Sequence, residues 1–315
     1  MRTGPDCSLI GLPLAGLALI LSGALHAAED AGDYQRQLSD LDVSRPESVC
    51  AARTSLRALM PNANPADRAA MFRAFRAFYI ESVSASVPAF TKQMAPHADD
   101  IETSLTHSEP HEALRALLQR RPDIAKAGAG WFQCGFSVME GEGDLYPDQD
   151  PATLLEFASE LPPGLASYIR FRAREDAERI AEDAALQLTW EQLRERLARW
   201  ERFAKDHPQL LETHSEVEPA IRSLATLYFF GIDNTPTFDF TTGLLNPELL
   251  ASWQQYVALN RDSRYQPLIA ALLPRLAADN QKITERDRPL FQQFGFTEEF
   301  GNWWRYFQFR MNGSR

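Results

Sequence analysis

Lysine is scarce in this sequence. Only four of the 32 basic residues are lysines, which leaves 28 arginines. Such a bias, together with abundant alanine, is typical of bacteria with GC-rich genomes. Acidic residues outnumber basic ones, and the formal net charge is -11. A surface this acidic repels phosphate backbones and anionic lipids, so we expect neither nucleic acid nor a membrane surface as a partner.

Long hydrophobic runs are absent beyond the first residues of the chain. The single run covers residues 9–21, follows the basic Arg2 and precedes a group of small residues. It is shorter than the ~20 residues needed to cross a bilayer, and the pattern is typical of a secretory signal peptide. We therefore predict a signal peptide over residues 1–27, no membrane anchor in the mature chain, and a periplasmic location, with secretion as the alternative.

Cysteine is also rare. The chain has three cysteines, and Cys7 lies within the predicted signal peptide. Cys50 and Cys134 remain, an even number in an oxidising compartment, which favours a disulfide between them. Two buried free thiols are the alternative.

Strand-like alternation is nearly absent. Only residues 237–242 alternate, and that stretch is too short to make a sheet. Helix starts recur instead, such as the Thr189/Gln192 capping box and the Asn64-Pro65 pair. Apolar residues follow helical spacing in two stripes: Phe72, Phe75, Tyr79 and Val83 in one, and Leu193, Leu197, Trp200 and Phe203 in the other.

These patterns predict an all-α fold. We expect an irregular multi-helix bundle of roughly ten helices over residues 28–315, in one body or in two lobes, with two long ordered loops. A boundary between lobes is expected near residues 205–218. The charge-rich segments 170–183 and 191–205 alternate in sign at helical spacing, which predicts solvated helix faces.

Standard catalytic motifs are missing. No Gly-x-Ser-x-Gly occurs, and His111-Glu112 is not followed by the second histidine of a His-Glu-x-x-His motif. His107 and His111 lie astride a helix start and lack a third ligand, so no metal and no cofactor are predicted. Glu81-Ser82 resembles the catalytic Glu-Ser of lytic transglycosylases, but the Gly-Leu-Met-Gln element of that family is absent. Whether the chain is an enzyme stays open.

Two segments without helical periodicity are candidate binding loops. The first, residues 128–150, places Glu140, Glu142 and Asp144 between glycines. It could bind a cation or supply a general acid, or be a solvated loop. The second, residues 231–243, carries Asp233, Asn234 and Asp239. These side chains either fold the turn by bonding their own backbone or join the first loop in one acidic cleft.

The C-terminal segment is rich in aromatic residues. At ~100° per residue, Phe300, Trp304 and Phe307 form one helical stripe, while a second stripe lies beside it. The members of the second stripe are Trp303, Tyr306 and Arg310. One stripe is enough to dock the helix, so the second is either buried by other helices or available to a partner or sugar.

Two functions therefore stand as hypotheses. The first is a periplasmic binding or interaction protein, of partner-binding, inhibitor or scaffold type, whose partner is an envelope protein or the cell-wall glycan. The second is a cell-envelope glycan hydrolase or lyase that uses the loop carboxylates. The absence of catalytic motifs favours the first.

The disulfide gives a direct test. The mass of the exported protein should rise by two hydrogens on reduction, and Cys50 and Cys134 should resist thiol labelling until the protein is reduced. Labelling of both cysteines in the native, unreduced protein would contradict the pairing.

Overall fold

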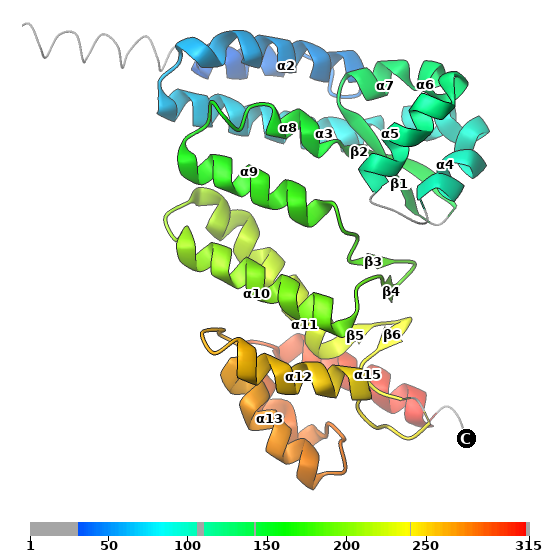
Figure 1. Cartoon of the computed structure of the whole chain (residues 1–315), viewed down its shortest axis with the longest axis vertical. Coiled ribbons are helices and arrows are strands. Elements are labelled where there is room, and N and C mark those ends of the chain that lie inside the picture. The colour runs from blue at the N-terminus through cyan, green and yellow to red at the C-terminus, as the bar shows by residue number, and fades with distance from the viewer. Residues whose placement is uncertain (1–30, 106–109, 142, 240, 313–315) are drawn as a thin grey trace, which may run out of the picture. The chain divides into compact units, whose positions relative to one another are not determined.

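The chain is described from a computed structural model (Figure 1), which covers residues 31–105, 110–141, 143–239 and 241–312, with side chains up to residue 308. The described residues are 71% helical and form only short two-stranded sheets, so the predicted all-α class is confirmed. The predicted signal peptide, residues 1–27, lies outside the described residues. Among the helices that are described, none combines the length and apolarity needed to span a membrane.

The helices and strands follow one another in this order. The first part of the chain contains α2 (Pro46–Leu59), α3 (Pro65–Met94), α4 (Ala98–Leu105), α5 (Pro110–Arg120), α6 (Pro122–Ala127), α7 (Ala129–Gln133), β1 (Phe136–Gly141), β2 (Asp144–Gln149), α8 (Pro151–Leu155) and α9 (Pro163–Asp176). The remainder contains β3 (Ala181–Glu182), β4 (Ala185–Leu186), α10 (Trp190–Asp206), a π-helical turn (Thr213–Val217), α11 (Glu218–Phe230), β5 (Gly231–Ile232), β6 (Thr235–Pro236), α12 (Pro247–Leu259), α13 (Gln266–Ala278), α14 (Arg288–Gln293) and α15 (Thr297–Asn312). Short 3-10 turns cover Met60–Asn62, Ala95–His97 and Glu285–Asp287.

The chain divides into two compact units. The first comprises the residues up to Ser104, Ala113–Met139 and Leu145–Ile169. The second comprises Leu105–Glu112, Glu140–Asp144 and Arg170–Arg315. The division falls within α9, whereas residues 205–218, where the sequence places a lobe boundary, lie inside the second unit.

The core of the first unit is built on α3. Asn64 begins this helix by accepting hydrogen bonds from the backbone N–H groups of Ala66 (2.9 Å) and Asp67 (3.0 Å). Phe72 and Phe75, from the predicted apolar stripe, are fully buried. Both make edge-to-face contacts with the ring of one further phenylalanine, which follows α8. Phe72 and Phe75 therefore face the core, as their helical spacing predicts.

The predicted disulfide is present in the first unit. The sulfur atoms of Cys50 and Cys134 are 2.01 Å apart and their Cα atoms 4.7 Å apart. The bond links α2 to the end of α7 across 84 positions of sequence. In the chain-entropy view, a loop of that size contributes on the order of 4 kcal/mol by restricting the unfolded chain.

Residues 128–150 contain an antiparallel hairpin as well as a helix. The sequence predicts an irregular loop there, but the segment forms α7, β1 and β2. The pairing depends on residues distant in sequence: Asp150 donates its backbone N–H to the carbonyl of Gly135 (2.9 Å) and to the hydroxyl of Tyr79 (3.0 Å). The Tyr79 hydroxyl in turn donates to the carbonyl of Gly135. No local alternation reveals this hairpin, because its base is fixed by α3.

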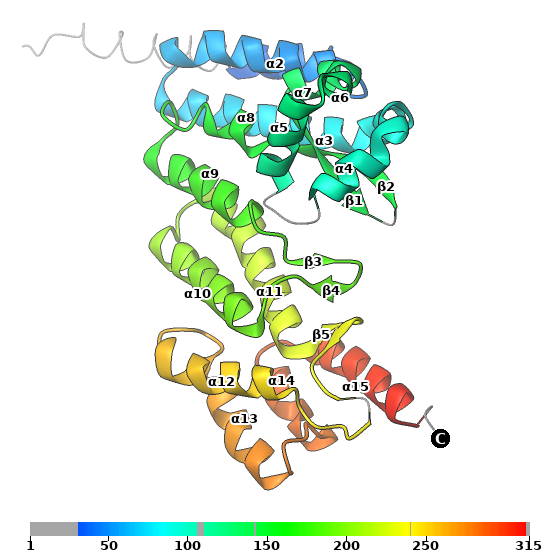
Figure 2. The same ribbon diagram turned by 45° about the vertical axis from the view of Figure 1, so that its right-hand side comes forward.

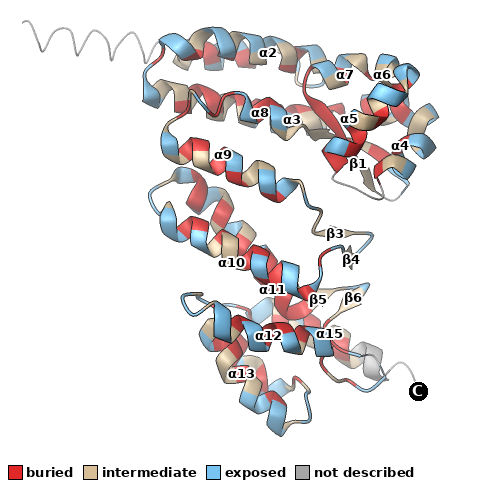
Figure 3. Cartoon of the chain, viewed as in Figure 1, coloured by how far each residue is buried: buried red, intermediate tan, exposed pale blue. Residues whose placement is uncertain are grey.

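In the second unit, α10 is the central helix. It begins at the predicted capping box, in which Thr189 and Gln192 exchange hydrogen bonds of 2.8 and 3.2 Å. It packs against α11 and α12, and Figure 3 shows buried residues along both α10 and α11. Its stripe of Leu193, Leu197 and Trp200 is buried, as the spacing predicts.

The charged face of α10 departs from the prediction of a fully solvated surface. Glu175, at the end of α9, is 1% exposed, and Arg196 is 3% exposed. The Glu175 carboxylate accepts hydrogen bonds from Arg199 Nε (2.9 Å) and Trp200 Nε1 (3.1 Å), and Arg196 Nε lies 3.3 Å away. Opposite charges and a donating indole make burial of these groups tolerable, and the sequence does not show which helix supplies the partner.

Two glycines of the hairpin segment have positive φ, and replacing each of them by alanine should lower stability by a different amount. Gly135 has φ +100°, and a Cβ there would lie 2.3 Å from Thr153 Oγ1; Gly143 has φ +81° and open space around its Cβ position. Gly143→Ala should therefore cost about 1–2 kcal/mol of backbone strain. Gly135→Ala should cost more, about 3 kcal/mol or above, because it adds a clash with the buried Thr153. Urea unfolding measures both, and equal losses would show that the clash at Thr153 is relieved.

Candidate functional site

The first predicted acidic group lies on the β1–β2 hairpin. Glu140 is half-buried in β1, and Asp144 begins β2 and is exposed. Glu142 lies outside the described residues. The neighbouring Met139 is 48% exposed. The described acidic residues thus extend from two paired strands rather than from an irregular loop.

The second predicted group is engaged in local structure. The side-chain amide of Asn234 donates to the carbonyl of Asp183 (2.6 Å), and its backbone N–H donates to the carbonyl of Ala184 (2.8 Å). Asn234 therefore ties the β5–β6 hairpin to the β3–β4 hairpin; Figure 2 shows these hairpins side by side. Asp233 is exposed.

Asp239 closes its own turn. One of its carboxylate oxygens accepts hydrogen bonds from the backbone N–H groups of Thr241 (3.0 Å) and Thr242 (2.7 Å) and from the Thr242 hydroxyl (2.8 Å). These bonds, that of the Thr242 hydroxyl first, lower the pKa of Asp239. The geometry matches the alternative in which the side chain folds the turn.

The aromatic stripe of α15 is covered by the chain itself. Trp303 is 6% exposed, and its indole N–H donates to Thr237 Oγ1 at 3.0 Å. The ring of Phe238 packs against Trp303 (5.6 Å between centroids) and Tyr306 (6.4 Å). Residues 237 and 238 fold back over Trp303, which matches the alternative in which the chain itself covers this part of the second stripe. The side chain of Arg310 lies outside the described residues.

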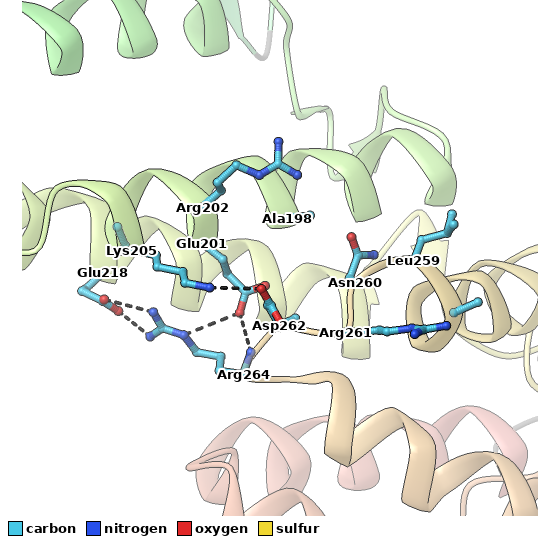
Figure 4. Close-up of a pocket in the computed structure, with 13 residues that line it drawn as sticks. Ala198, Glu201, Arg202, Lys205, Glu218, Leu259, Asn260, Arg261, Asp262 and Arg264 are labelled. Carbon is cyan, nitrogen blue, oxygen red and sulfur yellow. Dashed lines mark hydrogen bonds and ion pairs between the residues drawn. The ribbon is translucent and has the colours of Figure 1, made fainter.

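A cleft in the second unit brings together residues that the sequence analysis did not select. It encloses about 790 Å³ between α10 and the segment that joins α12 to α13. Its lining is mostly charged or polar (Figure 4): Glu201, Arg202, Lys205, Glu218, Asn260, Arg261, Asp262, Ser263 and Arg264, with Ala198, Ala204, Ala258 and Leu259.

Glu201 is the buried carboxylate of this cleft. Its side chain is 9% exposed. It accepts hydrogen bonds from the hydroxyl of Tyr256 (3.1 Å) and the backbone N–H of Arg264 (3.1 Å), and Arg264 Nε lies 3.5 Å away. Burial raises the pKa of Glu201 above its ordinary value, while the hydrogen bonds, that of the Ser263 hydroxyl first among them, act in the opposite direction.

Arg264 links Glu201 to α11. Its guanidinium binds both carboxylate oxygens of Glu218, at 2.5 and 3.0 Å. Such a bidentate pair is among the stronger charge-assisted contacts in proteins, and it lowers the pKa of Glu218. On the rim, Lys205 Nζ lies 3.0 Å from Asp262 Oδ2.

Three donors in the lining lack a partner among the described residues. The buried amide nitrogen of Asn260 has none. The exposed guanidinium groups of Arg202 and Arg261 take part in none of the ion pairs or hydrogen bonds of the described chain. In Figure 4, both arginines lie outside the connected chain of Glu218, Arg264 and Glu201.

The sequence carried only a weak signal for this cleft. Residues 260–264 are five consecutive polar residues between two helices, a composition that is typical of any loop. Glu201 and Arg202 belong to the segment predicted to be a solvated helix face. Their convergence with the loop depends on the packing of α10 against α12.

Comparison of the whole chain with models of known protein families, with characterised proteins and with solved structures finds no match. Within the described residues, no group of three or more His, Cys, Asp or Glu side chains is arranged to hold a metal ion. The candidate site therefore rests on the geometry of the cleft.

Glu201 and Glu218, the two carboxylates that flank Arg264, should make contributions to stability that change in opposite directions with pH. The pKa of Glu201 is raised by burial, so its contribution to stability is present at acidic pH and is lost as pH rises through the folded-state pKa. The pKa of Glu218 is lowered by Arg264, so its contribution is present above the unfolded-state pKa and is lost as pH falls through the folded-state pKa.

We therefore predict that Glu201→Gln becomes more stable relative to the unsubstituted protein as pH rises from about 3 to about 7. Glu218→Gln should become relatively less stable over the same range. Urea unfolding at a series of pH values measures both differences. Differences that follow the same slope in the two variants would contradict the assigned environments.

Proposed function

We propose that this chain is a binding or interaction protein of the bacterial cell envelope, exported to the periplasm, that acts without catalysis of its own. Secretion is the alternative destination. The observation that carries the proposal is the cleft beside α10, whose lining includes the buried carboxylate of Glu201 and the bidentate Arg264–Glu218 ion pair. Polar groups that the protein itself holds in place can orient a ligand or partner.

The carboxylates of the cleft are held by neighbouring groups. Glu201 accepts hydrogen bonds from Tyr256 and from the backbone of Arg264, and Glu218 is bound through both oxygens by the same arginine. A general acid or base must reach the proton that it transfers. Side chains engaged in this way favour binding over acid–base chemistry.

Only some of the predicted loop residues remain available for the hydrolase or lyase hypothesis. Asp239 closes its own turn, and Asn234 joins two hairpins. On the first segment, the described candidates that the sequence analysis assigned to this hypothesis are Glu140 and Asp144. Glycosidic chemistry needs two carboxyl groups about 5–10 Å apart on either side of a sugar, and the contacts of the hairpin do not by themselves supply that arrangement.

Two exposed leucines of the second unit provide a matched test of the binding surface. Leu259 lines the cleft and is 65% exposed, while Leu211 is 59% exposed and lies outside the lining. A photo-cross-linking amino acid at either position, in the exported protein mixed with periplasmic extract and cell-wall sacculi, should form a defined adduct only from position 259. The adduct is identified by mass spectrometry as an envelope protein or a glycan fragment.

Adducts of equal yield from positions 259 and 211 would argue against the cleft as the binding surface. Release of soluble fragments from sacculi by the purified protein, abolished by Glu140→Gln, would instead establish the hydrolase or lyase alternative.

A further inference from the structure

We infer that residues 260–264, which connect α12 to α13, form a strap that opens as one unit while the helices on either side of it stay folded. The latch of this strap is Arg264. All five residues of the strap line the cleft beside α10, so their movement changes the shape of the cleft. The inference rests on the proposed function, because it names how the cleft is opened to its partner.

The strap has no apolar anchor. Its five residues are all polar, and none of them is buried. Burial of apolar surface is the main term that makes a segment costly to detach from a fold. The strap can therefore separate from α10 and α11 without exposing the hydrophobic core, and its polar contacts set the free energy of opening.

The two ends of the strap are anchored, in contrast. Tyr256 in α12 is fully buried, and Tyr265, directly after the strap, is 5% exposed. The ring of Tyr256 packs against Tyr228 (5.7 Å between centroids), and that of Tyr265 packs against Phe229 (5.8 Å). Leu259, directly before the strap, is 65% exposed. Movement is thus confined to the segment between the two buried tyrosines.

Arg264 makes the contacts that hold the strap closed. Its guanidinium binds both carboxylate oxygens of Glu218 in α11, and its backbone N–H donates to Glu201 in α10 at 3.1 Å (Figure 4). The other ion pair of the strap joins Lys205 to Asp262, whose side chains are 67% and 86% exposed. Ion pairs as exposed as this one contribute little to stability, so Arg264 is the principal latch.

The closed position leaves one polar group without a partner. The amide nitrogen of Asn260, the first residue of the strap, is buried and has no acceptor among the described residues. A buried donor without an acceptor costs free energy. Water reaches this nitrogen when the strap opens, so the cost is specific to the closed position and offsets part of the stabilisation by Arg264.

Residue-resolved hydrogen exchange by NMR, on the full exported protein at neutral pH, tests the inference. The backbone N–H of Arg264 reports on the strap, because its acceptor belongs to another helix. The amides of Leu224 and Ala225, buried in α11, serve as the reference. We expect the Arg264 N–H to exchange faster than the reference after correction for intrinsic rates. Low concentrations of urea should not change its rate, because a local opening exposes little surface.

Glu218→Gln should accelerate exchange of the Arg264 N–H by about fivefold or more, because the guanidinium loses its charged, bidentate partner. Glu299→Gln is the matched control. Glu299 in α15 pairs with Arg222 of the same helix, α11, and its side chain is 28% exposed against 36% for Glu218. The control removes a comparable ion pair away from the strap and should leave exchange of the Arg264 N–H unchanged.

Three results would each overturn the inference. The first is exchange of the Arg264 N–H at the free energy and urea dependence of the reference amides, which would mean that the strap opens only when the unit unfolds. The second is an unchanged rate in Glu218→Gln. The third is equal acceleration by Glu218→Gln and Glu299→Gln.

The outcome is separable from that of the proposed function. Local opening at Arg264, without any adduct specific to position 259, would support the strap while removing the role as a partner-binding protein. An adduct specific to position 259, from a protein whose Arg264 N–H exchanges only together with the reference amides, would support the partner-binding role and overturn the strap.

Discussion

The second unit depends on the packing of α10 against the buried carboxylate of Glu175. Glu175 binds Arg196, Arg199 and the indole of Trp200. Removal of one partner from such a buried group is costly because it leaves an uncompensated charge. The network therefore fixes the rotation of α10 about its own axis, as well as its position.

That rotation determines where the functional candidates point. At 100° per residue, Arg196, Arg199 and Trp200 share one face of α10, and Glu201, Arg202 and Lys205 lie near the opposite face. The buried charge network on one face of α10 therefore directs Glu201, Arg202 and Lys205, on the other face, toward the cleft. The other wall is fixed by Arg264, which bonds Glu201 through its backbone N–H and Glu218 through its guanidinium. Three elements of the second unit meet at this residue.

Three of the residues singled out by their sequence pattern make hydrogen bonds that hold the fold together. Asn234 joins two hairpins, Asp239 closes a turn, and Trp303 donates to Thr237 beneath Phe238. These polar and aromatic side chains are conspicuous because the connections between helices need local hydrogen bonds and a cover for α15. A carboxylate in a loop and a tryptophan on a terminal helix are therefore weak indicators of a site in an all-α protein of this kind. The cleft consists of residue types that are common on any protein surface, and it exists only because the fold brings them together.

The sequence by itself determined the features that depend on near neighbours or on counting. Helical spacing predicted the all-α class, and the Thr189/Gln192 and Asn64 caps predicted helix starts. The even number of cysteines outside the predicted signal peptide predicted the Cys50–Cys134 pair. Only the tertiary structure decided the β1–β2 hairpin, the burial of Glu175 and Arg196, and the cleft at Glu201. The physical reason is that a helix cap or an apolar stripe is formed by residues only a few positions apart. A buried charge or a binding cleft needs partners from separate elements. No local sequence pattern encodes which of those elements lie together in space.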